Sequence, residues 1–383
     1  MNNSILHISH TDIRRDSRII KEIKVLSDEF VNYDIYAIGI KKDSDLYNIK
    51  LSLSGVKDLS ISLITKKIII FPKFIIYCLN YLEFFLKCIL KIYRKKITII
   101  HCHDFLALPI GYIAKLLFEC KLIYDAHELE SENNFVKFPK LIFFFEKFFW
   151  KKIDLFITVS PSILNWYHRN FGYKKNSILV LNTPEISNKS FVKKISLRKK
   201  LKIPKDKLIF LYVGSFQQGR GINIMLKAFS NPKINSKLVF VGYGISENEI
   251  KKFSNKYENI HILKSVPHNT LVQFIKSADV GLCIIEKVSL SDYYCLPNKF
   301  FEFAFANLHI LASNFPDMKK LIKTYSLGSY IKPNYKELIK KIEFFEINRN
   351  KIKMKKRNIT NLGWKTQSKN LVNGYKKIFK DYS

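Results

Sequence analysis

The sequence predicts an α/β protein made of two doubly wound domains, each built on a parallel sheet. Short apolar runs recur in both halves of the chain, and most are followed by a polar loop and an amphipathic helix pattern. This alternation is typical of parallel sheets with helical crossovers. The polar, Lys-rich residues 185–207 indicate a linker between the two series. We therefore expect domains over residues 1–190 and 191–360, and a final helix over residues 361–383 that packs back across both.

The first domain is expected to open with a strand over residues 5–8 and a polar loop over residues 10–16. The helix that follows has apolar residues at helical spacing and is capped by Asp16 or Ser17. Loops after the strands of such a sheet line its ligand crevice. Further strands are expected at residues 33–40, 97–101, 121–125, 155–159 and 178–181.

The second domain is expected to repeat this order. Its first strand precedes a glycine-rich loop and a helix that contains Met225, Leu226 and Phe229. The tail over residues 364–379 has aromatic and aliphatic residues in a helical rhythm. Strands of this domain are expected at residues 208–213, 238–241, 260–263, 280–285 and 309–312.

The composition is strongly basic. The 383 residues include 65 Lys and Arg against 32 Asp and Glu, a net charge of +33. Such a balance favours anionic partners, namely nucleic acid, anionic lipid or phosphorylated substrates. The lysines are spread along the chain, so charge alone does not choose among these partners.

The six cysteines form no Cys-x-x-Cys pair, and most lie in apolar surroundings. They predict reduced, buried thiols in a cytoplasmic protein. The first ten residues have no charged segment followed by an apolar core, so we expect no signal peptide.

Two basic amphipathic stretches, residues 71–94 and 135–152, have bulky apolar side chains interspersed with lysines. Charged residues interrupt the long apolar run over residues 68–92, which therefore predicts an amphipathic helix and not a membrane span. Such helices can lie in a membrane interface, or they can pack on the sheet. They could also bind nucleic acid, but no nucleic-acid-binding motif accompanies them. We expect contact with an anionic membrane surface and no nucleic acid.

Residues 289–302 form the strongest candidate binding motif. A helix that begins near Pro297 would direct its free N–H groups at the preceding loop, which suits a phosphate. Lys299 adds a positive charge in the first turn, where an anion would explain it. Glu302 lies on the same helix face as Asn298 and could accept hydrogen bonds from a ribose. The alternative is a surface helix with incidental charges.

Two other loops are candidates. The glycines from Gly214 to Gly221 would let backbone N–H groups approach a phosphate, and Arg220 could bind its oxygens; the alternative is a plain turn. His127 and Glu128 follow a strand, where they could act near a sugar or simply hold a loop. The imidazoles of His101 and His103, followed by Asp104, could imitate a metal cluster. No third ligand to join the two imidazoles stands out in the sequence, so we expect no metal.

Together these features resemble glycosyltransferase family 4, nucleotide-sugar-dependent enzymes of the GT-B fold. The resemblance extends over almost the whole chain, and the order and spacing of its motifs are specific. The stretches that carry it are Asp16-Ser17-Arg18, His101-Cys102-His103-Asp104, Tyr124-Asp125-Ala126-His127-Glu128, Thr158-Val159-Ser160, Asn182-Thr183-Pro184, Tyr212-Val213-Gly214, Arg220-Gly221, Val241-Gly242-Tyr243-Gly244, Ala278-Asp279-Val280 and Leu296-Pro297-Asn298-Lys299-Phe300-Phe301-Glu302.

The resemblance implies two Rossmann-like domains facing across a cleft, and a retaining sugar transfer that needs no metal or other cofactor. Glu302 would bind the donor ribose. Arg220 and Lys299 would hold the pyrophosphate and stabilise the departing nucleoside diphosphate. His127 would lie near the donor sugar, and the loop over residues 10–18 would face the acceptor.

The first loop lacks the paired glycines seen in many family members, and two single positions also depart from the family pattern. Tyr294 stands where many members have the first of two paired glutamates, and Ser215 stands where many have an arginine. Ser215 would leave more of the phosphate charge to Arg220 and Lys299.

The function that the resemblance implies is elongation of a lipid-linked saccharide for a surface polysaccharide, by a cytoplasmic enzyme peripheral to the inner face of the plasma membrane. One alternative is a nucleotide-sugar epimerase of the same fold, which would need a pair of acid/base carboxylates. Another is a non-catalytic basic protein that binds anionic lipid or nucleic acid.

Overall fold

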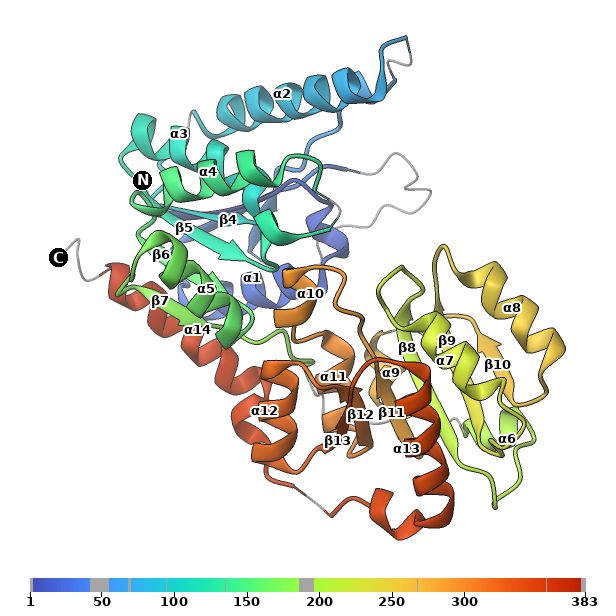
Figure 1. Cartoon of the computed structure of the whole chain (residues 1–383). Helices are drawn as coiled ribbons and strands as arrows, with labels where there is room; N and C mark the ends of the chain where they lie inside the picture. The colour runs from blue at the N-terminus through green and yellow to red at the C-terminus, as the bar shows by residue number, and fades with distance from the viewer. Residues whose placement is uncertain are drawn as a thin grey trace. The chain divides into compact units, whose positions relative to one another are not determined.

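The computed structural model contains two compact units (Figure 1). The N-terminal unit comprises Met1–Val180 and Lys365–Ser383, and the C-terminal unit comprises Leu181–Trp364. The structure describes residues 3–41, 55–67, 70–93, 95–134, 136–185, 196–266, 268–355 and 357–379. The predicted boundary at residue 190, part of the predicted linker, and Arg94 and Phe135 of the basic stretches lie outside these ranges.

The N-terminal unit contains a seven-stranded sheet in the order β3-β2-β1-β4-β5-β6-β7, and every strand pair is parallel. The winding reverses between β1 and β4, and in sheets of this kind ligands bind at such a point. The strands are β1 (Ser4–Ser9), β2 (Asp34–Ile38), β3 (Val56–Asp58), β4 (Ile99–His103), β5 (Lys121–Ala126), β6 (Leu155–Thr158) and β7 (Ser177–Leu179).

Helices α2, α3 and α4 lie together on one side of this sheet, and α14 lies on the other (Figure 1). Gly374 lets α14 approach β7, because a Cβ atom there would come within 2.5 Å of Ile178 Cδ1. Tyr375 is fully buried, with its ring 5.9 Å from that of Phe30. The helices are α1 (Ser17–Glu29), α2 (Lys73–Ile92), α3 (Leu108–Phe118), α4 (Pro139–Trp150), α5 (Pro161–Phe171) and α14 (Trp364–Phe379); four 3-10 helices are η1 (Ile13–Arg15), η2 (Thr65–Lys67), η3 (Phe105–Ala107) and η4 (Glu130–Glu132).

The C-terminal unit contains a six-stranded parallel sheet in the order β10-β9-β8-β11-β12-β13. A buried apolar cluster that includes Phe210, Phe229 and Phe345 joins the sheet to α7 and α13. The strands are β8 (Ile209–Ser215), β9 (Lys237–Tyr243), β10 (Ile260–Leu263), β11 (Val280–Cys283), β12 (His309–Ser313) and β13 (Gly328–Ile331). The helices are α6 (Leu197–Lys200), α7 (Ile222–Phe229), α8 (Glu247–Lys256), α9 (His268–Ile275), α10 (Leu290–Tyr294), α11 (Asn298–Phe305), α12 (Pro316–Tyr325) and α13 (Tyr335–Ile347), with 3-10 helices η5 (Arg349–Ile352) and η6 (Thr360–Leu362).

The predicted fold class is confirmed: both units are α/β with parallel sheets. The sequence missed two edge strands, β3 and β13, since β3 has only three residues and β13 begins with Gly328 and Ser329. The strand predicted from residue 97, with His103-Asp104 at its end, begins two residues later, at Ile99. The strand continues to His103 and is buried along its whole length, because it pairs with β1 and β5 on its two sides.

Within the described residues, no helix is both long enough and apolar enough to cross a membrane.

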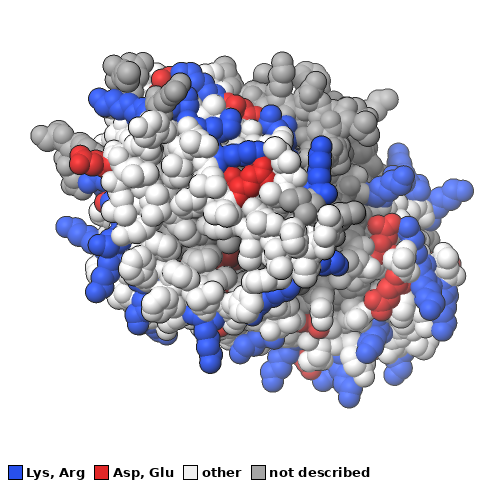
Figure 2. All heavy atoms as spheres, turned by 90° about the horizontal axis from the view of Figure 1, so that it is seen from above, with Lys and Arg blue, Asp and Glu red and all other residues white. Residues whose placement is uncertain are grey.

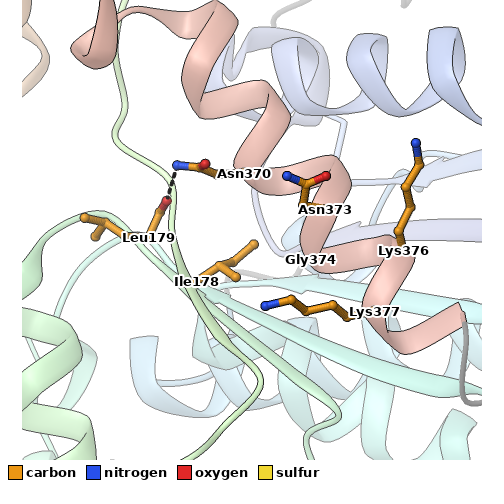
Figure 3. A pocket seen from close by; sticks show the side chains of 7 residues that line it. All are labelled: Ile178, Leu179, Asn370, Asn373, Gly374, Lys376 and Lys377. Carbon is orange, nitrogen blue, oxygen red and sulfur yellow. Dashed lines mark hydrogen bonds between the residues drawn. The ribbon is translucent and has the colours of Figure 1, made fainter.

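A hollow of about 560 Å³ lies between β7 and α14 and is lined by Ile178, Leu179, Asn370, Asn373, Gly374, Lys376 and Lys377 (Figure 3). Asn370 Nδ2 donates a hydrogen bond to the Leu179 carbonyl across it (3.4 Å). No residue that the sequence predicts for the site lines this hollow.

Candidate active site

In the N-terminal unit, polar side chains gather where β1, β4 and β5 end. The backbone N–H of His127 donates to Asp104 Oδ1 (3.2 Å), and His127 Nδ1 lies 3.7 Å from Asp104 Oδ2. Burial disfavours the His127 imidazolium, but the carboxylates of Asp104 and Asp125 outweigh this effect and raise the pKa of His127 to about 10. The site therefore holds a charged imidazole at neutral pH.

Asp104 has an unusual backbone conformation, with φ 63° and ψ 169°. This region is almost restricted to glycine, and residues held in it are found preferentially at active sites and ligand clamps. The N–H of Asp104 donates to the Asp125 carbonyl (3.0 Å), which helps to hold the turn. The geometry thus directs a carboxylate at His127 at the expense of backbone strain.

Asp125 is fully buried beside this edge. It accepts two hydrogen bonds from the Arg18 guanidinium (3.0 and 3.1 Å) and one from His127 Nε2 (3.1 Å). Burial favours the neutral acid, but Arg18 and His127 hold the pKa of Asp125 well below its ordinary value. Asp125 is therefore an anion whose charge is compensated within the unit.

The two predicted residues of this loop differ in their surroundings. The side chain of His127 is 14% exposed, whereas Glu128 is exposed and accepts a hydrogen bond from Asn133 Nδ2 (2.5 Å). Glu130, which the sequence analysis did not select, is close enough to Asp104 for their carboxyl groups to interact electrostatically. Burial, and the nearby Asp104 carboxylate, raise the pKa of Glu130 well above its ordinary value. Its only sequence signal was the Glu-x-Glu spacing after His127.

The first loop borders a hollow of about 410 Å³, which is lined by His10, Thr11, Asp12, Arg15, Asp16, Ile40 and Lys66. Asp16 accepts hydrogen bonds from the N–H groups of Arg18 and Ile19, so it is the cap of α1. The buried Nδ1 of His10 has no hydrogen-bond partner among the described residues. The hollow therefore combines cationic, anionic and hydrogen-bonding groups, as a saccharide or phosphate would require.

In the C-terminal unit, α11 begins at Asn298 with Pro297 at its N-cap. Lys299, in the first turn, is only 8% exposed, and its ammonium lies 3.7 Å from the centre of the Tyr212 ring. Among the described residues this ammonium has no hydrogen-bond partner. A buried ammonium without hydrogen bonds is energetically costly, and a bound anion would compensate it.

The loop after β8 carries Arg220, whose Nη1 forms an ion pair with Asp292 Oδ1 (3.2 Å). Gly219 and Gly221 have left-handed φ values of 78° and 68°. At Gly221 a Cβ atom would come within 2.7 Å of the Ile284 carbonyl oxygen, so only glycine fits there. Asp292 is a further site residue that the sequence analysis did not find.

Arg220 and Lys299 lie at the same edge of this sheet. Cys283 is the last residue of β11, and burial raises the pKa of its thiol to about 11. The positive charges of Lys299 and Arg220 both favour the thiolate and so lower this pKa. The two positive charges are thus within electrostatic reach of one strand end.

The remaining predicted residues lie at this edge or on α11. Gly214 has φ 126°, and a Cβ atom there would meet no other atom within 4 Å, which leaves open space beside the end of β8. Glu302 is 6% exposed and lies one turn after Asn298 on α11. The structure therefore brings together the four motif residues from Pro297 to Glu302 on one helix terminus.

Two overlapping groups in the N-terminal unit could offer metal ligands: His7, His101 and His103, and Glu22, His101, His103 and Asp125. The Arg18 guanidinium contacts the two carboxylates of the second group, with Nε 3.0 Å from Glu22 Oε1. A divalent ion there would be repelled by this buried cation. The imidazoles of the first group are linked by a hydrogen bond between His7 Nδ1 and His103 Nε2 (3.0 Å).

Comparisons with known proteins agree with this architecture. A model of the family "Glycosyltransferase Family 4" matches residues 55–184, and one of "Glycosyl transferases group 1" matches residues 193–361. A chitobiosyldiphosphodolichol beta-mannosyltransferase of Candida albicans is 27% identical over 228 residues, which are 54% of this chain and 49% of that protein. The chain spans about half the length of the curated relatives it matches.

Solved structures show the same fold. Sucrose-phosphate synthase from Thermosynechococcus elongatus superposes with a TM-score of 0.78 at 15% identity, covering 100% of both chains. Anabaena HepE, in a complex with UDP-glucose, superposes with a TM-score of 0.70 at 13% identity, covering 100% of this chain and 99% of that one. The two family matches together extend over most of the sequence: residues 55–184 form a domain of Glycosyltransferase Family 4 and residues 193–361 a domain of the Glycosyl transferases group 1, on the GT-B fold.

Proposed function

We propose that this protein transfers a sugar, with retention of anomeric configuration, from a nucleoside-diphosphate sugar to a saccharide acceptor. The observation that carries the proposal is the buried ammonium of Lys299 at the start of α11, which has no hydrogen-bond partner in the part of the chain that the structure describes. A helix N-terminus with a desolvated cation is suited to a diphosphate. The complex of HepE with UDP-glucose supports a nucleotide-sugar donor of this class.

In this proposal the C-terminal unit binds the donor. Lys299 and Arg220 hold the pyrophosphate and stabilise the charge that develops on the leaving nucleoside diphosphate. Asp292 orients Arg220 through one nitrogen, and the other N–H groups of the guanidinium remain for phosphate oxygens. Glu302 binds the ribose, and the open space at Gly214 admits the donor close to the backbone.

The N-terminal unit supplies the other groups. The His127 imidazolium donates to a hydroxyl of the donor sugar, and Glu128 accepts from a sugar hydroxyl at the rim of the same loop. The hollow beside the first loop receives the acceptor. The two cations of the C-terminal unit neutralise the diphosphate, so we propose that transfer needs no metal ion or other cofactor.

The acceptor in this proposal is a lipid-linked saccharide at the inner face of the plasma membrane, in surface polysaccharide synthesis. The C. albicans relative, named for a diphosphodolichol acceptor, supports a lipid-linked substrate. The apolar face, which we define as the exposed large apolar side chains of α2, α3, α4 and the α4 N-cap residue, fits an anionic bilayer. Its members are Phe74, Ile75, Tyr77, Leu82, Leu86, Leu90, Leu116, Leu117, Phe138, Leu141, Phe144, Phe145 and Phe148.

The apolar face is continuous from helix to helix. The rings of Phe74 and Phe138 lie 6.0 Å apart, and those of Tyr112 and Phe148 lie 5.9 Å apart. Figure 2 shows this side of the N-terminal unit as a broad area without charged side chains, with Lys and Arg along its margins. Exposed aromatic side chains flanked by lysines are suited to an interface of anionic headgroups.

The donor proposal is tested with a panel of UDP-, GDP- and ADP-sugars, by their thermal stabilisation of the protein and by product formation. The substitution Lys299→Met is expected to abolish both, whereas Lys227→Met, at an exposed lysine of α7, serves as the control. Proton NMR of the anomeric signal reports whether configuration is retained. No stabilisation by any nucleotide sugar would contradict the proposal, and a product of inverted configuration would contradict the retaining mechanism.

One observation favours a second candidate, the nucleotide-sugar epimerase. The carboxyl groups of Asp104 and Glu130 interact electrostatically, and acid/base epimerisation requires two carboxyl groups in one site. An epimerase converts its nucleotide sugar without an acceptor, so product analysis with donor alone separates the two activities. A non-catalytic basic protein would give no turnover, and its binding would be insensitive to Lys299→Met.

A further inference from the structure

We infer that Tyr375 of α14 is a positioning residue for His127, acting through His101 and Asp125. The inference rests on the proposed function only in assigning His127 to catalysis. It connects a helix at the end of the chain with the loop after β5, and neither family match includes that helix.

The connection is a series of buried polar contacts. The Tyr375 hydroxyl lies 2.7 Å from His101 Nδ1, and His101 Nε2 lies 3.6 Å from Asp125 Oδ2. The same Asp125 oxygen lies 3.1 Å from His127 Nε2. Tyr375, His101 and Asp125 are each 0% exposed, so water does not compete for these contacts.

The chemistry of these groups determines where the protons lie. Burial raises the pKa of Tyr375 and lowers that of His101, so both are neutral at physiological pH. A neutral phenol donates to the bare Nδ1 of the imidazole, which leaves the proton of His101 on Nε2, facing Asp125. The hydroxyl of Tyr375 thereby selects the tautomer whose N–H faces Asp125 Oδ2 at 3.6 Å, an electrostatic contact that is longer than a hydrogen bond.

Asp125 is surrounded by such donors. Arg18 contributes two hydrogen bonds and is itself fixed by the Val180 carbonyl (2.9 Å) and by Glu22. His103 Nδ1 lies 3.6 Å from the carboxylate and 3.2 Å from His127 Nε2. With its donors arranged in this way, the carboxylate has one orientation, and His127 has one position from which to contact it.

The consequence for the reaction is geometric. A hydrogen-bonded imidazole contributes to transfer only if it is held within a few tenths of an ångström of the position that the donor sugar requires. Loss of the Tyr375 hydroxyl leaves His101 free to carry its proton on either nitrogen. Asp125 then loses the electrostatic contact with the His101 N–H, and the orientation of His127 is less restricted.

The test is histidine-selective ¹⁵N NMR of the full chain, whose nine histidines can be assigned by single substitutions. We compare the wild type with Asp125→Asn and Tyr375→Phe. The control is Tyr81→Phe, which removes a tyrosine hydroxyl that donates to the Leu106 carbonyl (3.1 Å) in the same unit. The readouts are the tautomer of His101, the titration of His127, and kcat and KM for the donor.

We expect Asp125→Asn to lower the titration midpoint of His127 by about 1–3 pH units, since an opposite charge in contact has been removed. We expect Tyr375→Phe to convert His101 from one tautomer to a mixture and to lower kcat with little change in KM. Tyr81→Phe should change neither readout. If Asp125→Asn does not fold, the Tyr375→Phe result decides.

Two results for Tyr375→Phe would overturn the inference: a His101 tautomer identical to that of the wild type, or a changed tautomer with unchanged kcat. An unchanged His127 midpoint in folded Asp125→Asn would also do so. The NMR readouts require no substrate. A wild type without transferase activity but with the expected spectra would therefore count against the proposed function and not against the contact pathway.

Discussion

The ammonium of Lys299 lies over the ring of Tyr212, 3.7 Å from its centre, and has no hydrogen bond among the described residues. Its attraction to the aromatic face offsets only part of the cost of desolvating the ammonium of a residue that is 8% exposed. A bound anion would therefore stabilise this ammonium.

The substitution Lys299→Met should stabilise the protein without ligand and abolish its response to UDP. Removing an uncompensated ammonium is expected to add up to about 1–2 kcal/mol to the unfolding free energy of the C-terminal unit. The wild type should gain about 2.7 kcal/mol at UDP concentrations one hundred times Kd, and the variant nothing. Thermal unfolding with and without UDP measures both effects. A destabilised variant that still responds to UDP would contradict this account.

Arg220→Ala should weaken UDP binding by about 1.5–3 kcal/mol, the range for hydrogen bonds to charged groups. Arg220→Lys should restore only part of this loss, because an ammonium cannot contact Asp292 and a phosphate in the planar, forked geometry of a guanidinium. Calorimetric titration with UDP gives the affinities. Equal affinity of Arg220→Lys and the wild type would show that charge alone matters here.

The N-terminal unit should lose stability as the pH rises. Burial raises the pKa of Glu22 to about 8, although Arg18 acts in the opposite direction. The folded state therefore retains a proton that the unfolded state releases near pH 4.5, so this stabilisation is complete below pH 4.5 and lost as the pH rises through 8. His127, with its pKa raised to about 10, extends the loss with the same sign from pH 6.5 to 10.

Glu22→Gln should flatten the first part of this profile, because the amide resembles the protonated acid at every pH. Thermal unfolding at intervals from pH 5 to pH 9, with Glu247→Gln at a partly exposed residue of α8 as the control, measures the difference. If stability falls with pH in parallel for Glu22→Gln and the wild type, the pH dependence does not come from Glu22.

Reversing the charge of Lys147, Lys151 and Lys152, all exposed at the end of α4 or just after it, should weaken binding to anionic vesicles. Each lysine near such a surface contributes about 1 kcal/mol, and added salt should reduce the wild-type affinity. The same reversal at Lys251, Lys252 and Lys340, exposed lysines of the C-terminal unit, changes the net charge equally and serves as the control. Equal weakening by both triple variants would indicate non-specific attraction.

Chelation should leave transfer unaffected. The cations of Arg220 and Lys299 are proposed to neutralise the diphosphate, and Arg18 opposes a divalent ion at the buried imidazoles. Initial rates before and after EDTA treatment, with Mg²⁺ or Mn²⁺ added back, measure this. A loss of activity that either metal restores would refute it.

Local patterns in the sequence were sufficient for the fold and for part of the candidate site. Alternating apolar runs and amphipathic helices predicted two parallel α/β sheets, and the helical rhythm of the tail predicted α14 over the residues that form it. The motif from Pro297 to Glu302 predicted a helix terminus, and a helix begins at Asn298. Each of these depends on residues close together in the chain, whose side-chain periodicity is visible without coordinates.

Tertiary structure decided which polar groups are buried and what compensates them. Nothing near Asp125 in the sequence indicates that Arg18 and His101 surround it, or that the hydroxyl of Tyr375 lies 2.7 Å from an imidazole 274 residues earlier. Asp104 and Glu130 likewise become a carboxyl pair only when β4 and β5 lie side by side. The physical reason is that desolvation and Coulomb interaction depend on distance in space, whereas the periodicities of a sequence report only on neighbours along the chain.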